Sequence, residues 1–260
     1  MIDPLMFIAL LPAVVLVVYI CRKDRTDKEP PALIAKLLGY GVLSCLPAIV
    51  VELILSAIIE RLNVRNVYLG YFLEAFVVAG LTEETCKFLF LRTTWGNPAF
   101  DYQFDAIVYA VMVALGFAAF ENVKYVYSYG FATGIVRAVT AVPGHAIFGV
   151  FMGYFYGYAK LSDYWGRDDD RKAYLALSVV VPVLMHGCYD FLAFTQESDS
   201  RFTLLFYAYL VALYVFGIRR VNRSSRDDRR VTRETVFDYF RRMQYPMPPQ
   251  YRDRDDDFWR

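Results

Sequence analysis

The strongest constraint on this chain is a series of apolar runs, each about as long as a lipid bilayer is thick. These runs of about 20 residues alternate with short polar connectors over residues 4–218. A helix of about 20 residues crosses a hydrocarbon layer roughly 30 Å thick. Of the 260 residues, 57% are hydrophobic, whereas soluble domains average about 45–50%. The sequence therefore indicates an all-α, polytopic membrane protein, and it disfavours a soluble enzyme, a disordered chain or a disulfide scaffold.

Seven of these runs are long enough to be transmembrane helices. Helix is the predicted structure because unpaired backbone groups are too costly in lipid. Lysine and arginine gather in the first and fifth connectors and in the C-terminal tail, which predicts that these parts are cytoplasmic and the N-terminus is outside. The predicted spans are about residues 4–21, 32–59, 67–92, 105–127, 135–160, 173–195 and 202–218.

The chain divides into a membrane domain and a basic tail. We assign residues 1–218 to the membrane domain and residues 219–260 to a cytoplasmic tail that is rich in arginine. Within the tail, Thr235 and Asp238 match a helix N-terminal capping pattern. A short amphipathic helix on the inner leaflet is one interpretation, and a partly disordered tail without fixed structure is the other. We expect membrane lipids, and no nucleic acid, among the partners of the protein.

Ionisable side chains occur inside the predicted spans, where each costs roughly 2.5–3.5 kcal/mol on insertion scales. The only two histidines of the chain are among them. At a helical rise of about 1.5 Å per residue, the ionisable side chains of the third to sixth spans lie at comparable depths in the membrane. We therefore expect them to form one buried site, at or beyond the midplane of the membrane. The residues concerned are Glu83, Glu84, Lys87, Glu121, Lys124, His145, His186 and Asp190.

Helical spacing predicts which of these groups interact. Lys87 lies three and four residues after the two glutamates, so it can partly neutralise either one. Asp190 lies one turn after His186 and can orient its imidazole. The four cysteines contain no C-x-x-C pair and are expected to be free packing residues. Cys188 is two residues from His186 and so points to another side of the helix, which argues against a cysteine nucleophile.

Other residues receive structural interpretations. Glu52 and Glu74 lie nearer the ends of their spans, and we interpret them as interfacial or packing residues. Asp105 begins the fourth span and is expected to cap it. Gly153 and Gly157 continue a face of small residues, which predicts close helix packing.

Four motifs in separate spans resemble those of the PrsW family of bacterial intramembrane proteases. They are E-E-x-x-K at 83–87, F-x-x-x-E at 117–121, H-x-x-x-G at 145–149 and H-x-x-x-D at 186–190. The resemblance covers about residues 67–195 and extends more distantly to CAAX prenyl endopeptidases and bacteriocin-immunity proteins. It implies site-1 cleavage of a single-span anti-sigma factor on its extracytoplasmic side. It also implies the bacterial inner membrane as the location and a role in stress signalling.

Two mechanisms fit this set of residues. In the first, Glu83 and Glu84 activate water, and His145 and His186 position the water and the oxyanion. Lys87, Glu121, Asp190 and Asn122 would then be orienting or supporting residues. In the second, Glu121, His145, His186 and Asp190 hold a divalent metal ion, with zinc as the expected cofactor. We prefer the first mechanism, and the second stays open.

Three other classes of protein use the same kinds of residue. Glutamate and histidine inside spans also build the relays of proton- or ion-coupled transporters. Two histidines on facing helices, here His145 and His186, could ligate a haem. A non-catalytic immunity or scaffold protein is the third alternative.

Overall fold

The structure is a computed structural model that describes residues 3–232 and Arg241. Six of its helical segments are long and apolar enough to cross a membrane, namely α1, α2, α5, α6 with α7, α8 and α9. The prediction of an all-α, polytopic membrane protein is therefore confirmed. The helical elements are α1 (Pro4–Lys23), α2 (Pro31–Leu62), α3 (Val67–Phe72), η1 (Leu73–Leu81), α4 (Thr82–Leu91), η2 (Arg92–Thr94), α5 (Gln103–Tyr129), α6 (Phe131–Val139), α7 (Ala141–Tyr164), α8 (Asp168–Ser198) and α9 (Arg201–Arg226).

Seven spans were predicted, and the third is not among these six because it is divided into three shorter helical segments. The segments α3, η1 and α4 follow one another without a gap, and η1 is a π-helix of nine residues. The Thr82 hydroxyl donates to the Val77 carbonyl, five residues earlier, in keeping with the wider π turn. A uniform α-helix was the prediction, so the sequence pattern missed this feature. π-Helical turns inside α-helices are frequent at functional sites.

The predicted fifth span is also divided. Thr140, with φ −124° and ψ −74°, interrupts the helix and separates the short α6 from α7. The outward face of α6 is apolar and exposed, including Ile135, Val136 and Val139. Its one cation, Arg137, is directed toward the neighbouring α5. The break thus places a charged side chain of α6 next to the predicted site.

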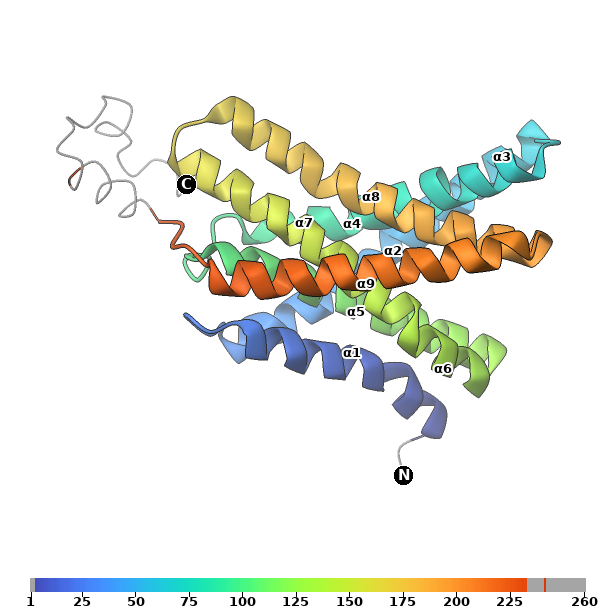
Figure 1. The fold of residues 1–260 in the computed structure, drawn as a ribbon, viewed down its shortest axis with the longest axis horizontal. Helices are drawn as coiled ribbons and strands as arrows, with labels where there is room; N and C mark the ends of the chain where they lie inside the picture. The colour runs from blue at the N-terminus through green and yellow to red at the C-terminus, as the bar shows by residue number, and fades with distance from the viewer. Residues whose placement is uncertain (1–2, 233–240, 242–260) are drawn as a thin grey trace.

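Helix α5 forms the centre of the bundle, as Figure 1 shows, with α2, α7 and α1 packed around it. Small residues permit these close approaches. Gly41 of α2 faces Gly116 of α5, and Gly153 of α7 faces the α5 backbone at Ala106. Gly157 likewise lies against Gln103. The expected packing role of Gly153 and Gly157 is confirmed, since a Cβ at either position would crowd α5.

The surface of the bundle explains why the chain is so apolar. Large hydrophobic side chains are exposed along α1, α2 and α9, as at Phe7, Leu53 and Leu204. Such a surface is stable against acyl chains, whereas contiguous patches of this kind are rare on soluble monomers. The capping pattern at Thr235 and Asp238 lies outside the described residues, so the tail helix stays a prediction.

Gly41 and Gly39 provide a matched test of the α2–α5 contact. A Cβ on Gly41 would overlap backbone atoms of Val113, Gly116 and Phe117, whereas a Cβ on Gly39 would meet nothing within 4 Å. Gly41→Ala is therefore expected to destabilise the protein by about 1–3 kcal/mol. Gly39→Ala is expected to be neutral or to stabilise it by up to about 1 kcal/mol. Thermal unfolding in detergent measures both, and equal effects would contradict the close contact.

Candidate functional site

The first turns of α4 place two carboxylates and an ammonium group at the centre of the bundle. Lys87 Nζ lies 3.1 Å from Glu83 Oε2 and 2.8 Å from Glu84 Oε1. It also lies 3.1 Å from His145 Nδ1 and 4.0 Å from the centre of the Phe117 ring. All three α4 side chains are buried. The predicted pairing of Lys87 with both glutamates is therefore present in the structure.

His186 is held between carboxylates on both sides of its ring. Its Nδ1 lies 3.0 Å from Glu84 Oε1 and 3.9 Å from Glu83 Oε2, and its Nε2 lies 3.3 Å from Asp190 Oδ2. Ionised carboxylates only accept hydrogen bonds, so this arrangement favours an imidazolium that donates from both nitrogens. The expectation that Asp190 contacts His186 agrees with the geometry.

His145 has a different hydrogen-bonding environment. An ammonium group can only donate, so the Lys87 contact makes His145 Nδ1 an acceptor. The proton of a neutral ring then resides on Nε2, which lies 2.9 Å from Glu121 Oε2. The His145 and His186 rings touch edge to face, with centroids 5.1 Å apart. The two histidines are thus neighbours with different hydrogen-bonding roles.

Arg137 of α6 completes this network. Its guanidinium donates to Glu121 Oε2 at 2.9 Å and to Asn122 Oδ1 at 3.0 Å, and it lies over the Tyr125 ring. Asn122 is fully buried and donates to the Ala9 carbonyl of α1. Asn122 therefore supports Arg137 and does not contact either histidine. The sequence does not predict this role of Arg137, because its contact with Glu121 depends on the turn at Thr140.

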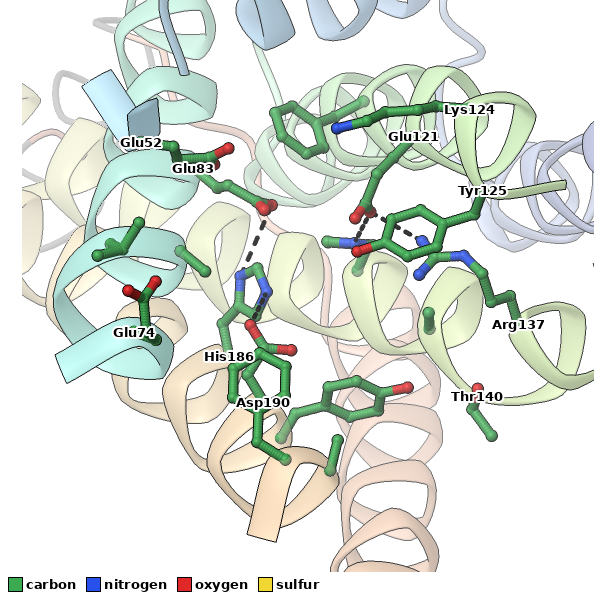
Figure 2. Close-up of a pocket in the computed structure, with 18 of the residues that line it drawn as sticks. Glu52, Glu74, Glu83, Glu121, Lys124, Tyr125, Arg137, Thr140, His186 and Asp190 are labelled. Carbon is green, nitrogen blue, oxygen red and sulfur yellow. Dashed lines mark hydrogen bonds and ion pairs between the residues drawn. The ribbon is translucent and has the colours of Figure 1, made fainter. Parts of the chain in front are cut away.

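A cavity of about 640 Å³ opens beside these residues. Figure 2 shows the carboxylates of Glu83, Glu121 and Asp190 gathered around it, together with His186. Glu84 is absent from its lining and is completely buried behind the neighbouring groups. The two adjacent glutamates thus differ, since one faces a space that can hold water and a peptide and the other faces only protein.

Four further polar residues line the cavity, and among them Lys124 was expected at the site. Glu52 of α2 and Glu74 of η1 lie along one wall, and Lys124 and Tyr125 of α5 lie along another (Figure 2). Glu52 and Glu74, which we interpreted as interfacial or packing residues, therefore also face the cavity. In the sequence, each of these two residues is a lone carboxylate within a long apolar stretch. Whether its side chain faces the cavity depends on how α2 and η1 are oriented toward α5.

Charge balance explains how so many ionised groups can be buried together. A buried charge that loses its partner costs about 3–5 kcal/mol, because its remaining neighbour is left uncompensated. Here each carboxylate has a cationic or imidazole partner within 4 Å: Glu83 and Glu84 with Lys87, Glu121 with Arg137, and Asp190 with His186. The whole set is one connected network, so its members are expected to depend on one another for stability.

The donor atoms of this network also fit a divalent metal ion. One ligand atom each from Glu83, Glu84, His145 and His186 lies within 4.8 Å of the others. Oxygen and imidazole nitrogen donors of this kind suit zinc. Glu121 and Asp190 contact the opposite nitrogens of the two rings, where carboxylates commonly orient metal-bound histidines. This set differs from the expected one of Glu121, His145, His186 and Asp190, which stays a prediction.

The contact between the two imidazoles bears on the haem alternative. A haem ligated by both histidines has its porphyrin between their rings. The rings of His145 and His186 are instead in direct contact, so no space for a porphyrin exists between them.

Comparison with known proteins identifies the family. The family described as "PrsW family intramembrane metalloprotease" matches residues 29–218. "Protease PrsW" of Bacillus subtilis (strain 168) is 34% identical over 214 residues, covering 82% of this chain and 92% of its own length. The chain belongs to the PrsW family. "Protease PrsW" of Oceanobacillus iheyensis is 35% identical, with 82% and 93% of the two chains covered, and that of Clostridioides difficile (strain 630) is 28% identical, with 87% and 94% covered.

Family membership decides between the broad classes that the sequence left open. The PrsW family consists of intramembrane metalloproteases, so this chain is a membrane peptidase rather than a transporter. The buried cluster of two glutamates and two histidines is the chemistry expected of such an enzyme. No solved structure matches the chain.

Proposed function

We propose that this protein cuts a single-span membrane protein in the extracytoplasmic half of the bilayer, as a site-1 protease acting on an anti-sigma factor. The observation that carries the proposal is the position of the cavity. It lies toward the C-terminal ends of α2, α5 and α8 and the N-terminal ends of α7 and α9. The basic connectors and the tail follow the opposite ends of these helices. By the positive-inside rule, this arrangement supports a cavity in the outer half of the membrane, which we propose is the bacterial inner membrane.

In the proposed reaction, Glu83 acts on water in the cavity. Its carboxylate takes a proton as the water oxygen attacks the peptide carbonyl carbon, which produces a tetrahedral oxyanion. The positive charge of the His186 imidazolium stabilises that oxyanion, and His145 orients the water. Glu83 then transfers the proton to the departing nitrogen as the C–N bond breaks, which leaves a carboxylic acid and an amine.

The remaining residues hold this geometry. Glu84 fixes His186 through Nδ1, and Asp190 fixes it through Nε2. Glu121 and Arg137 orient His145. A zinc ion would be held by Glu83, Glu84, His145 and His186, and it would supply a more acidic water and a Lewis acid. Lys87 now contacts three of those four side chains, so binding of the ion requires the Lys87 ammonium to move.

Co-expression with single-span anti-sigma factors of the same host tests the proposal. Each substrate carries different tags on its cytoplasmic and extracytoplasmic ends. The wild type is expected to produce a cytoplasmic-tag fragment that retains the membrane span, because the cut lies on the outer side. His186→Ala should produce none, and Asp169→Asn, which changes an exposed residue of α8, should cleave normally.

Two results would contradict the proposal. Cleavage that persists in both Glu83→Gln and His186→Ala would show that neither residue is required for the reaction. A fragment lacking the span would place the cut on the cytoplasmic side and reverse the proposed orientation.

A further inference from the structure

A second group of acidic residues, of which Asp24 and Asp105 are buried and Glu29 and Asp228 partly buried, lies at the opposite end of the bundle from the cavity. Three separate parts of the chain contribute to it. Asp24 and Glu29 belong to the connector between α1 and α2, Asp105 to the first turn of α5, and Asp228 to the segment after α9. Glu29 approaches Asp24 and Asp105, and Asp24 interacts electrostatically with Asp228. None of the four takes part in the catalytic network.

Backbone contacts fix the three segments in position. Asp228 Oδ1 accepts the N–H of Phe104 at 2.9 Å, and Asp105 Oδ2 accepts that of Tyr102 at 2.6 Å. Asp105 was expected to begin the span and cap it; the helix instead begins at Gln103, and Asp105 caps it from the first turn by accepting the N–H of Tyr102. Backbone hydrogen bonds also link residue 103 to 229 and residue 231 to 101. The segment after α9 is thus attached to the start of α5, and its carboxylate is held beside the others.

Several oxygens in this group are buried without a hydrogen bond. Among the described residues, none forms a hydrogen bond with Asp24 Oδ1, Glu29 Oε2 or Asp105 Oδ1. The hydroxyl of Tyr109, a residue with no exposed surface, lies beside Glu29 and Asp105 and interacts with the Glu29 carboxylate. A buried polar atom without a partner costs about 1–3 kcal/mol. The three carboxylate oxygens on Asp24, Glu29 and Asp105 together point to a ligand that would satisfy them.

The charge of the group points to a cation. Two cationic side chains lie near the group: Arg230 pairs with Asp101 at 3.6 Å, and Lys28 interacts electrostatically with Asp24. Four carboxylates held this close together repel one another, and a bound cation would offset that repulsion.

We propose that Asp24, Glu29, Asp105 and Asp228, with the Tyr109 hydroxyl, form a binding site for a hard divalent cation, Mg²⁺ or Ca²⁺. Carboxylate and hydroxyl oxygens are the donors that such ions prefer, and the group contains no nitrogen or sulfur donor that would favour zinc. The cation links the α1–α2 connector, α5 and the segment after α9. It stabilises the end of the bundle from which the basic tail emerges.

Thermal unfolding of the full-length protein in detergent tests this site. The protein is first treated with a chelator and then supplied with MgCl₂ or CaCl₂, while NaCl of equal ionic strength serves as the control. Saturating cation is expected to raise the melting temperature by about 5 °C or more, and the salt control should not. Comparison of the Mg²⁺ and Ca²⁺ series identifies the preferred ion.

Two variants locate the effect. Asp24→Asn and Glu29→Gln each remove one charge with little change in shape, and each should abolish most of the shift. Asp169→Asn lies exposed at the start of α8 and should retain it. If added cation leaves the melting temperature of the wild type unchanged, the proposal is wrong. The carboxyl groups would then be accommodated by sharing protons. A full shift in both variants would also overturn it, because the cation would then bind elsewhere, including at the catalytic cluster.

Discussion

Replacing Glu83 with glutamine is expected to lower proteolysis by about 10²–10⁴-fold without unfolding the protein. The amide keeps the size of the side chain and an oxygen that can accept from Lys87, which lies 3.1 Å away. It cannot take a proton from water. Cleavage of a co-expressed substrate, or of a substrate reconstituted with the purified enzyme, measures the loss.

The neighbouring Glu84 and a distant glutamate make this prediction specific. Glu84→Gln weakens the contacts with Lys87 and His186 behind the cavity, so it should lower the melting temperature more than Glu83→Gln does. Glu60→Gln changes an exposed residue near the end of α2 and should alter neither the rate of proteolysis nor the melting temperature. If Glu83→Gln cleaved at the wild-type rate, a different base would have to activate the water.

Replacing Lys87 with methionine is expected to destabilise the protein by about 3–5 kcal/mol. Methionine is similar in length but carries no charge, so Glu83 and Glu84 would stay buried without their shared cation. His145 would also lose its contact at Nδ1. Thermal unfolding of the purified protein, together with its accumulation in membranes, measures this effect.

A second substitution separates charge from packing. In Lys87→Met, the further change Glu84→Gln removes one uncompensated carboxylate, so the double variant should recover part of the lost stability. Lys172→Met, on the exposed start of α8, should have no effect. A Lys87→Met protein as stable as the wild type would show that the carboxylates are not held by this ammonium group.

The arrangement of partners explains how this chain can bury so many charged groups in one place. Each of these charges has a specific partner, and the partners come from α4, α5, α6, α7 and α8. The network therefore fixes the relative positions of five helices at the place where the substrate must bind. Loss of one partner is expected to disturb both stability and geometry, which is why the two readouts above are measured together.

The different environments of the adjacent Glu83 and Glu84 could not be predicted from their spacing. Both lie within helical reach of Lys87, and the sequence treats them as a pair. Only the position of α8 decides that Glu84 contacts His186 at 3.0 Å while Glu83 faces the cavity. Glu74 of the π-helix η1 and Glu83 of α4 both line the cavity.

The sequence by itself determined the all-α membrane architecture, the family and the set of ionisable residues inside the spans. Hydrophobic length and the high cost of burying charge in lipid are local properties, so they can be recognised without coordinates. Only the tertiary structure decided which partner each charge has, that Arg137 reaches Glu121, and that a second acidic group gathers near Asp24 and Asp105. These contacts join residues far apart in the chain, and their existence depends on helix rotation and on breaks such as Thr140, which hydrophobic periodicity does not encode.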